Sequence, residues 1–436
     1  MWQMTLTRRE LLLLTLTVAV QLAHGRASAQ GLATTPPMGW NSWNHYRCNV
    51  SDALIRAQAD AMLSSGMKAA GYQYVNIDDC WEGERDTNGY IHPNSKFPDM
   101  KALADYVHGK GLKLGIYSSP GPKTCGKYEG SYGHEQQDAE MYAKWGIDYL
   151  KYDWCSAANI YQPNEYPAAI RKMHDALVHA GRPIVYSIHG RGAVWEWAAA
   201  AGANLWRTTG DISDLYARMI AIGFGQSGLE KFAGPGHWND PDYLVPNAGM
   251  TASQAQSQFT LWAILAAPLV VSADLMTMPE WTRRMLLNQT AIGIDQNPRG
   301  LQAHLAFRLR GTEAWVKPLS GQAAAVAVLN QAAQPAAVRL TGPMLGFPAA
   351  RSFSAVDVWA GRTFVADRPM LVSIAPETAV LLRVVARRRG SPAPASRFRS
   401  SQGRPQSSGG RPRSSRGRAR STRVTARSSS SKGGPR

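Results

Sequence analysis

Acidic residues are missing from the last fifty positions of the chain, 387–436. This segment holds 14 Arg and one Lys, which are 15 of the 48 basic residues behind the net charge of +17. The remainder carries 33 basic against 31 acidic residues, so we do not expect the folded part to bind nucleic acid. The segment is rich in Ser, Arg, Gly and Pro and too poor in apolar residues to form a core. We predict a disordered tail, which either binds polyanions or an acidic cell surface or is a solvated extension without a binding role.

A long apolar run is also missing near the N-terminus. The mostly apolar run at 11–20 is too short to span a bilayer comfortably. Arg8 and Arg9 precede it and Ala27-Ser28-Ala29 follows, which is the pattern of a charged region, an apolar region and a cleavage site. The paired arginines suit a twin-arginine signal, although Sec signals show the same pattern. We predict that residues 1–29 are a signal peptide and that the mature protein is exported, periplasmic or secreted; an uncleaved membrane anchor is the alternative.

Cysteine is scarce, with only Cys48, Cys80, Cys125 and Cys155. The sequence has no C-x-x-C pair and no His cluster with the spacing of metal ligands, so we expect no zinc site and no cofactor. In an exported protein an even number of cysteines indicates disulfides, and four of them allow three connectivities. The local pairing, 48 with 80 and 125 with 155, would close loops of about thirty residues, each worth roughly 3–4 kcal/mol in the chain-entropy model.

A Gly-rich phosphate loop is absent after the first apolar run, which argues against a dinucleotide-binding open sheet. Instead an apolar run, a polar or aromatic cluster and a helical pattern recur eight times between residues 30 and 300. Eight such units over about 250 residues predict an α/β fold of the (β/α)₈ TIM-barrel type. Ser51 is the expected N-cap of a helix that reaches about Ala70. The strands are expected in the segments 38–43, 74–81, 113–118, 147–150, 183–189, 204–211, 236–242 and 268–274.

The texture of the sequence changes after about Leu301. Short apolar runs, such as 325–329, 355–359 and 378–382, are separated by Gly and Pro and show little helical period. We predict a small C-terminal antiparallel β-sandwich at 301–386, followed by the tail at 387–436.

A Lys and an Asp follow the fourth predicted strand, two residues apart. Side chains alternate along a strand, so Lys151 and Asp153 are expected on one face. An ammonium group beside a carboxylate favours the ionised carboxylate, which is the form needed by a nucleophile that attacks a sugar carbon. A lone K-x-D would equally suit a salt bridge that ends a strand. Asp211 ends the sixth strand and would supply the second carboxylate of glycoside cleavage, protonated when substrate binds.

Further polar groups stand where other strands end, at the rim that holds the active sites of such barrels. Asp78, Asp79, Arg207 and Asp242 offer charged groups for sugar hydroxyls. Trp40 offers an apolar face for a sugar ring and Tyr117 a further polar contact. Taken alone, Asp78 and Asp79 would also suit a helix N-cap or a turn, and Arg207 a buried ion pair.

Six motifs in this order resemble those of glycoside hydrolase family 27, the α-galactosidase (melibiase) family. They are PPMGWNSW at 36–43, NIDDCW at 76–81, LKLGIY at 112–117, LKYDWC at 150–155, WRTTGDI at 206–212 and WNDPD at 238–242. The resemblance covers residues 33–300 and implies an exo-acting retaining α-galactosidase with an α-galactoside oligosaccharide or polysaccharide as substrate. It implies that Asp153 is the nucleophile, that Asp211 is the acid/base, and that the cysteines pair 48 with 80 and 125 with 155. It also implies sugar contacts from Trp40, Asp78, Asp79, Tyr117, Lys151, Arg207 and Asp242.

The chain departs from this family after the fifth strand. There the family usually has Ser-x-Cys-Glu-Trp or Ser-x-Cys-Gln-Tyr, which recognises the sugar near its 2-position. This chain has SIHGRG at 187–192, so the expected polar group is missing or is replaced by His189 or Arg191. The small Gly190 would leave room for a 2-acetamido group, which makes an α-N-acetylgalactosaminidase the alternative; His189 equally suits a strand cap. The Asp78-Asp79 pair favours a hexose with a 6-hydroxyl over an arabinopyranose.

Two further points bear on the function. Tyr243 stands where many members of the family have Met, which we take as a mild change. A carbohydrate-binding or cell-surface protein that has lost catalysis is the alternative from a different functional class, but the carboxylates needed for catalysis are all present.

Overall fold

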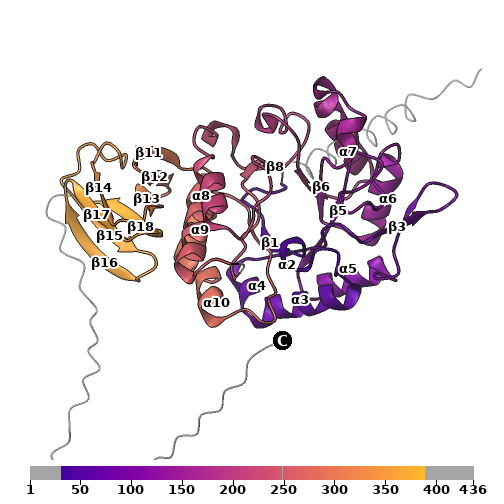
Figure 1. The fold of residues 1–436 in the computed structure, drawn as a ribbon, viewed down its shortest axis with the longest axis horizontal. Helices are drawn as coiled ribbons and strands as arrows, with labels where there is room; N and C mark the ends of the chain where they lie inside the picture. The colour runs from indigo at the N-terminus through magenta and orange to yellow at the C-terminus, as the bar shows by residue number, and fades with distance from the viewer. Residues whose placement is uncertain (1–30, 248, 388–436) are drawn as a thin grey trace, which may run out of the picture. The chain divides into compact units, whose positions relative to one another are not determined.

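The computed structural model describes residues 31–247 and 249–387, which form a parallel barrel followed by an antiparallel domain (Figure 1). The predicted signal peptide at 1–29 and the predicted tail from residue 388 onward lie outside the described residues. Within the described part of the chain, no helix has the length and apolar character that crossing a bilayer requires.

Eight parallel strands form the first part, as predicted. From the first strand to the seventh, each strand pairs with the next along the chain, and the eighth pairs with the first. The ring closes through Leu244, whose N–H donates to Val270 O at 2.8 Å and whose carbonyl accepts from Ser272 N at 2.8 Å. The strands are β1 (Met38–Asn41), β2 (Tyr74–Asn76), β5 (Lys113–Ser118), β6 (Tyr149–Tyr152), β7 (Val185–Ile188), β8 (Leu205–Arg207), β9 (Trp238–Asp240) and β10 (Leu269–Val271).

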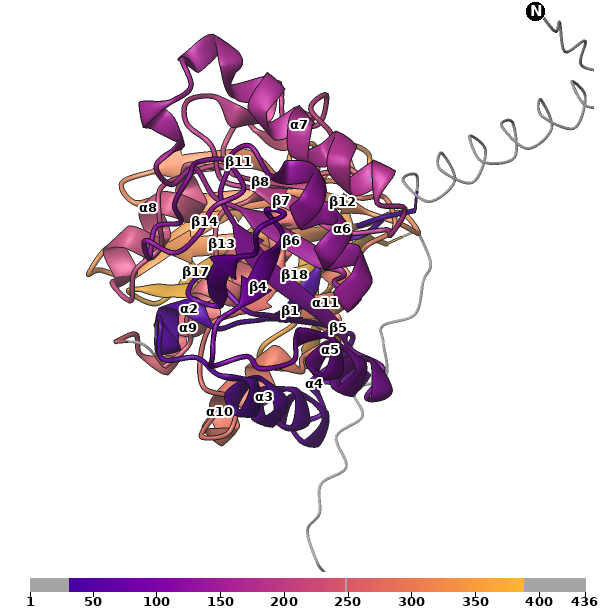
Figure 2. The same ribbon diagram turned by 90° about the vertical axis from the view of Figure 1, so that its right-hand side faces the viewer.

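Helices surround these strands (Figures 1 and 2). The buried residues of α5 are Met100, Leu103, Ala104 and Val107, a spacing that places one apolar stripe against the barrel. The α-helices are α2 (Trp43–Tyr46), α3 (Asp52–Ser64), α4 (Met67–Ala70), α5 (Met100–Gly109), α6 (Glu135–Trp145), α7 (Tyr166–His179), α8 (Tyr216–Phe224), α9 (Ala252–Leu265), α10 (Glu280–Leu286) and α11 (Gln289–Asp295). Short 3₁₀ turns are η1 (Ala157–Asn159), η2 (Pro163–Glu165), η3 (Val194–Glu196) and η4 (Glu230–Phe232).

One predicted helix is divided. Ser51 caps it as predicted, accepting a hydrogen bond from Leu54 N, but α3 ends at Ser64 and α4 begins at Met67. Gly66 between them has φ +88°, a left-handed conformation that breaks the helical path and suits glycine. A hairpin that the sequence patterns did not indicate, β3 (Glu82–Arg85) with β4 (Ile91–Pro93), follows β2.

The second part is the predicted antiparallel sandwich. Its six-stranded sheet has the order β11 (His304–Leu309), β12 (Thr312–Leu319), β13 (Ala323–Asn330), β18 (Thr378–Ala386), β15 (Ser352–Asp357) and β16 (Arg362–Asp367). Its two-stranded sheet pairs β14 (Ala336–Leu340) with β17 (Met370–Ile374). Along β13, Val326 and Val328 face the sandwich core, whereas Ala327 and Leu329 belong to the same apolar cluster as the barrel. The larger sheet is therefore buried on both faces at this strand.

Two titratable side chains, Lys317 and Asp295, are buried where β12 meets the barrel helices. Lys317 Nζ donates to the carbonyls of Ala263 and Asp295 at 3.3 Å each, and Asp295 is fully buried. Burial raises the pKa of Asp295 to about 8, with only partial relief from the Lys317 charge. Burial also lowers the pKa of Lys317 to about 8.

This site predicts a loss of stability between about pH 4 and pH 8. Because the folded state holds the Asp295 proton more tightly than the unfolded chain, stability is greatest below the ordinary carboxyl pKa and falls as pH rises to about 8. Asp295→Asn removes the titrating carboxyl group. We therefore expect the loss of unfolding free energy between pH 4 and pH 8 to shrink by roughly a few kcal/mol, at about 1.4 kcal/mol per pKa unit. The lowered pKa of Lys317 changes stability with pH only above about pH 8. Urea unfolding from pH 5 to 8 measures the slope, with exposed Asp367→Asn as control; equal slopes for wild type and Asp295→Asn would contradict the assignment.

Candidate active site

A pocket opens at the rim where the barrel strands end. Including its open mouth, it encloses about 440 Å³. Its walls come from the ends of most of the parallel strands, because all strand ends of a parallel barrel meet at one rim. The lining residues are Trp43, Asn44, Arg47, Asp78, Tyr117, Cys125, Lys151, Asp153, Arg207, Asp211, Ile212, Asp242 and Tyr243.

Asp153 lies directly after β6, with a side chain that is 15% exposed. Its Oδ1 accepts a hydrogen bond from Trp154 N at 2.8 Å and lies 3.0 Å from His189 Nδ1. Its Oδ2 lies 3.9 Å from Lys151 Nζ. Burial alone would raise the pKa of Asp153, but the His189 contact and the charges of Lys151 and Arg207 lower it well below its usual value. The carboxylate is therefore held ionised.

Lys151 shares the face of Asp153, but its hydrogen bond goes elsewhere. Nζ donates to Asp78 Oδ2 at 2.9 Å, and this oxygen also accepts from Asn41 Nδ2 at 2.9 Å and from Tyr243 OH at 3.2 Å. Burial would lower the pKa of Lys151, but the charges of Asp78, Asp153 and Asp242 raise it overall. Lys151 thus stays charged at the base of the pocket and supports two carboxylates.

Arg207 joins two further carboxylates across the pocket. Its Nη2 lies 2.7 Å from Asp242 Oδ2 and 3.2 Å from Asp211 Oδ1. Asp242 is buried, and its Oδ2 also accepts from Ile212 N at 2.8 Å. The Asp211 side chain, in contrast, is 73% exposed. Asp211 therefore lies at the solvent side of the pocket.

Two of the predicted sugar-contacting residues do not line this pocket. Trp40 is fully buried and its Nε1 donates to Ala273 O at 2.7 Å. Asp79 is buried as well; its Oδ1 accepts from Cys80 N at 2.7 Å and its Oδ2 from Gly126 N at 2.6 Å. Burial raises the pKa of Asp79, which hydrogen bonds partly offset. In this structure both residues brace the wall behind the lining groups.

Several lining residues were not predicted. Trp43 stands three residues after Trp40 in the same motif, and the Arg47 guanidinium lies 5.1 Å from the centre of its ring. The Tyr243 hydroxyl donates to Asp78, and its ring lies 5.3 Å from Lys151 Nζ, contacts that the sequence analysis did not foresee. The aromatic character of the rim segments was the available signal for Trp43 and Tyr243; nothing in the sequence pattern marked Asn44 as a lining residue.

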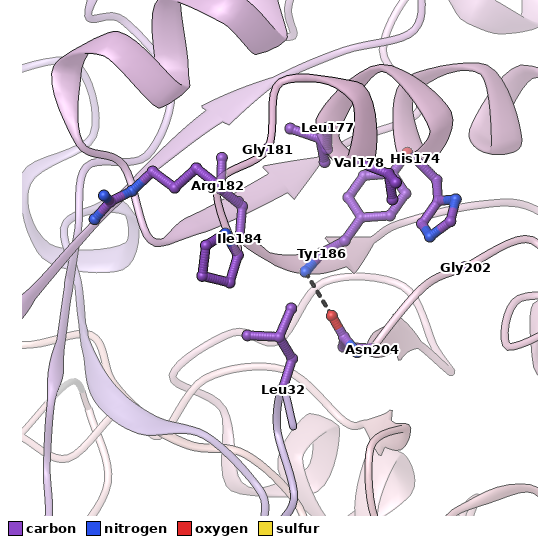
Figure 3. A pocket seen from close by; sticks show the side chains of 11 residues that line it. Leu32, His174, Leu177, Val178, Gly181, Arg182, Ile184, Tyr186, Gly202 and Asn204 are labelled. Carbon is purple, nitrogen blue, oxygen red and sulfur yellow. Dashed lines mark hydrogen bonds between the residues drawn. The ribbon is translucent and has the colours of Figure 1, made fainter. Parts of the chain in front are cut away.

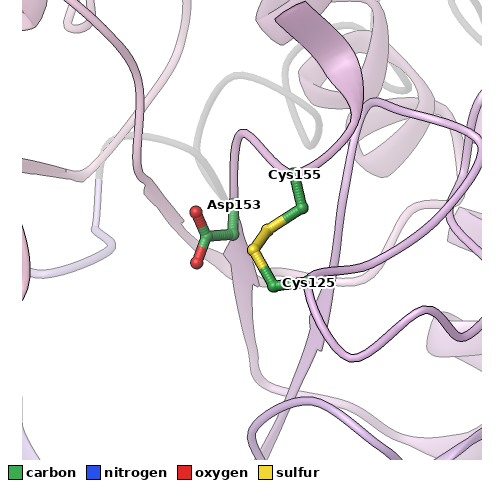
Figure 4. Close-up of side chains that lie close together, drawn as sticks. All are labelled: Cys125, Asp153 and Cys155. Atoms are coloured by element: carbon green, nitrogen blue, oxygen red, sulfur yellow. A yellow bond between two sulfur atoms is a disulfide. The ribbon is translucent and has the colours of Figure 1, made fainter.

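Both disulfides have the pairing that the resemblance implied. Cys48 pairs with Cys80 and Cys125 with Cys155, with Cα–Cα distances of 5.3 and 5.0 Å. The second disulfide lies beside Asp153 (Figure 4), and Tyr117 OH lies 3.2 Å from Cys155 Sγ. Because the two sulfur atoms are bonded to each other, this group does not offer the thiolates of a zinc site.

A second hollow lies at the opposite ends of the strands (Figure 3). Most of its residues lie in α7, around the start of β7 or just before β8, and Asn204 Oδ1 accepts from Tyr186 N at 3.0 Å there. No carboxylate is among its lining residues, which are Leu32, His174, Leu177, Val178, Gly181, Arg182, Pro183, Ile184, Tyr186, Gly202 and Asn204. Residues at this end of such barrels generally serve stability, so the carboxylate pocket is the candidate active site.

Comparison with known proteins identifies the family of this chain. The family model Alpha galactosidase A matches residues 35–297, and the model Alpha galactosidase C-terminal beta sandwich domain matches residues 310–384. Alpha-galactosidase A of Cellvibrio japonicus is 48% identical over 343 residues, which cover 74% of this chain and 84% of that protein. An alpha-N-acetylgalactosaminidase of Gallus gallus is 39% identical over 368 residues, 76% of this chain and 88% of that protein.

A solved structure of an α-galactosidase has a similar fold. Alpha-galactosidase I of Mortierella vinacea has a TM-score of 0.77 and 32% sequence identity, covering 82% of this chain and 98% of that one. With its barrel, its C-terminal sandwich and these matches, the chain belongs to glycoside hydrolase family 27, the α-galactosidase (melibiase) family, and is a glycoside hydrolase.

Proposed function

We propose that this enzyme is an exo-acting, retaining α-galactosidase with Asp153 as nucleophile and Asp211 as acid/base. The observation that carries the proposal is the pairing of an ionised, largely buried Asp153 with an exposed Asp211 in one pocket. Retaining glycosidases need one carboxylate that attacks and one that transfers a proton. The activity follows relatives named alpha-galactosidase, above all the 48% identical one.

The proposed reaction has two displacements. In the first, an oxygen of Asp153 forms a bond to the anomeric carbon while the bond to the leaving oxygen breaks, and Asp211 gives its proton to that oxygen. A galactosyl ester of Asp153 results. In the second, Asp211 takes a proton from water, the water oxygen bonds to the anomeric carbon, and Asp153 leaves as a carboxylate. Two inversions release galactose in its original α configuration.

The two carboxylates need opposite protonation states. Lys151 and Arg207 keep Asp153 ionised in the free enzyme. Arg207 Nη2 lies 3.2 Å from Asp211 Oδ1, and the Asp211 side chain is largely exposed. A bound galactoside would cover that side chain. The proposed role requires Asp211 to carry its proton when the first displacement begins.

The remaining polar groups would hold one terminal sugar. Asp78, Lys151, Arg207 and Asp242 present charged atoms at the closed end of the pocket, and Tyr117 adds a phenol. A pocket that is closed at the base admits the end of a glycan and excludes its middle, which supports exo action. Trp40 and Asp79 belong to the residues proposed for sugar binding, and they would act by supporting the lining groups from behind.

We also propose that residues 1–29 direct export and that the catalytic barrel spans 30–300, the β-sandwich 301–386 and the basic tail 387–436. The two disulfides support a location in which thiols are oxidised. An α-galactoside oligosaccharide or polysaccharide outside the cytoplasm is then the natural class of substrate.

The second candidate is an α-N-acetylgalactosaminidase. The 39% identical chicken relative carries that name, and the segment after β7 that normally reads the sugar 2-position is rebuilt in this chain. Gly190 packs near Val194, where an added Cβ would come within 2.9 Å of Cγ2, so this segment is tightly placed against η3.

Two chromogenic substrates separate these candidates. We expect p-nitrophenyl α-D-galactopyranoside to be hydrolysed with a kcat/KM at least ~100-fold above that of its 2-acetamido analogue, because a pocket that fits a hydroxyl has to accommodate a larger, polar group. A reversed preference would establish the second candidate. Binding of galactose without turnover of either substrate would contradict both and favour a carbohydrate-binding protein.

A further inference from the structure

His189 contacts the proposed nucleophile from the neighbouring strand. It directly follows β7, and its backbone N donates to Tyr152 O at 3.0 Å, which places its side chain beside the end of β6. Its Nδ1 is buried and lies 3.0 Å from Asp153 Oδ1. The N–H direction is not well aligned with this oxygen, so the contact is a close electrostatic pair and not a linear hydrogen bond. Catalytic hydrogen bonds are often poorly aligned before substrate binds.

The contact makes the two oxygens of Asp153 unequal. Oδ1 has two near neighbours, the N–H of Trp154 at 2.8 Å and His189 Nδ1. Oδ2 has Lys151 Nζ at 3.9 Å, which is beyond hydrogen-bond distance. An oxygen that accepts a hydrogen bond and has a second polar atom close by is the poorer nucleophile. Oδ2 is therefore the oxygen that is free to attack.

Resting on the proposed function, we infer that His189 is a positioning residue that holds Oδ1 of Asp153 so that Oδ2 meets the anomeric carbon. When Oδ2 bonds to the sugar, Oδ1 becomes the ester carbonyl oxygen. When water displaces Asp153 in the second step, the electron pair of the broken ester bond returns to the carboxylate, and the His189 N–H stabilises the charge on Oδ1. The segment that the family uses near the sugar 2-position thus serves the nucleophile in this chain.

Other charged groups also act on Asp153, one from its own strand and one from β8. Lys151 belongs to β6 and Arg207 to β8, and both cations lower the pKa of Asp153, while the neutral Tyr117 of β5 lines the same pocket. His189 is the contributor from β7. Removing it leaves the two cations in place, so the loss should be partial and visible in the acidic limb of the pH profile.

The test compares two replacements of His189. Asn places an amide nitrogen close to the position of Nδ1, whereas Leu fills the space without a donor. For His189→Leu we expect kcat to fall ~10-fold or more and the acidic limb of kcat/KM to move up by about one pH unit, with KM for the galactoside changed less than kcat. His189→Asn should recover most of kcat. Glu196→Gln, at an exposed position in η3 that the site does not use, serves as the control that leaves the acidic limb unchanged.

Two results would overturn the inference. One is a folded His189→Leu variant whose acidic limb coincides with that of wild type. The other is a loss that appears with the galactoside but disappears with its 2-deoxy analogue, because His189 would then be a contact to the 2-hydroxyl. Should His189→Leu fail to fold, His189→Asn and the 2-deoxy substrate still decide between these roles. Full activity of an Asp153 variant would instead remove the proposed function itself, so the two failures are distinguishable.

Discussion

Asp153→Asn is expected to lower kcat on p-nitrophenyl α-D-galactopyranoside by ~10⁴-fold or more while galactose affinity stays within a few-fold. An amide does not form the galactosyl ester, so the first displacement fails. The amide oxygen still accepts from Trp154 N, and the Lys151–Asp78 hydrogen bond does not involve the altered group. The sugar-binding groups should therefore keep their places. A discontinuous assay of released p-nitrophenol measures kcat, and titration calorimetry measures the affinity for galactose.

A small external nucleophile tests the same assignment more strictly. Asp153→Gly leaves space for azide, whose attack from the vacated face forms a C–N bond as the bond to a nitrophenolate breaks. The product should be the β-galactosyl azide, because only one inversion occurs. Asp175→Asn, on the exposed surface of α7, is the control and should keep wild-type turnover. More than a few per cent of residual activity in Asp153→Asn would show that another group is the nucleophile.

The placement of the site at one rim was predictable because of strand order. A parallel barrel brings the ends of all its strands together, so a polar residue after each apolar run is enough to assemble Asp78, Asp153, Arg207 and Asp242. The partner of Lys151 was not predictable in the same way. Local alternation pointed to Asp153, whereas the hydrogen bond goes to Asp78, 73 residues earlier. Only β5 lies between β2 and β6 in the barrel, and inward side chains of alternate strands meet in one layer.

Residues near strand ends were harder to assign. Trp40 is the third residue of β1 and packs into the core, but Trp43 begins α2 and reaches the pocket. Two tryptophans three positions apart differ only in where the strand stops, which depends on pairing with β2 and β10 and not on local sequence. The same reason applies to the division at Gly66, because a glycine after an amphipathic pattern is compatible with a helix end or with a tolerated interior position.

Asp211→Asn is expected to have an effect that depends on the leaving group. Melibiose, whose leaving oxygen needs a proton, should lose ~10³-fold or more in kcat/KM, within the range of general acid catalysis. A 2,4-dinitrophenyl galactoside, whose leaving group departs without a proton, should lose far less in the first displacement. The basic limb of the pH profile should also vanish, because that limb reports the loss of the acid's proton. Rates for both substrates over a pH series measure these effects.

Asp214→Asn is a matched control. Asp214 is an exposed carboxylate three residues after Asp211, and it does not line the pocket. It should leave both substrates and the basic limb unchanged. Azide should restore the second step of Asp211→Asn, since it needs no base, and should give the α-galactosyl azide with the opposite configuration to that from Asp153→Gly. An equal loss on melibiose and the dinitrophenyl galactoside would contradict proton transfer by Asp211 and leave it as an ion-pair partner of Arg207. The contrasting azide products follow from the proposed roles, in which Asp153 attacks one face of the sugar and Asp211 assists the leaving group on the other.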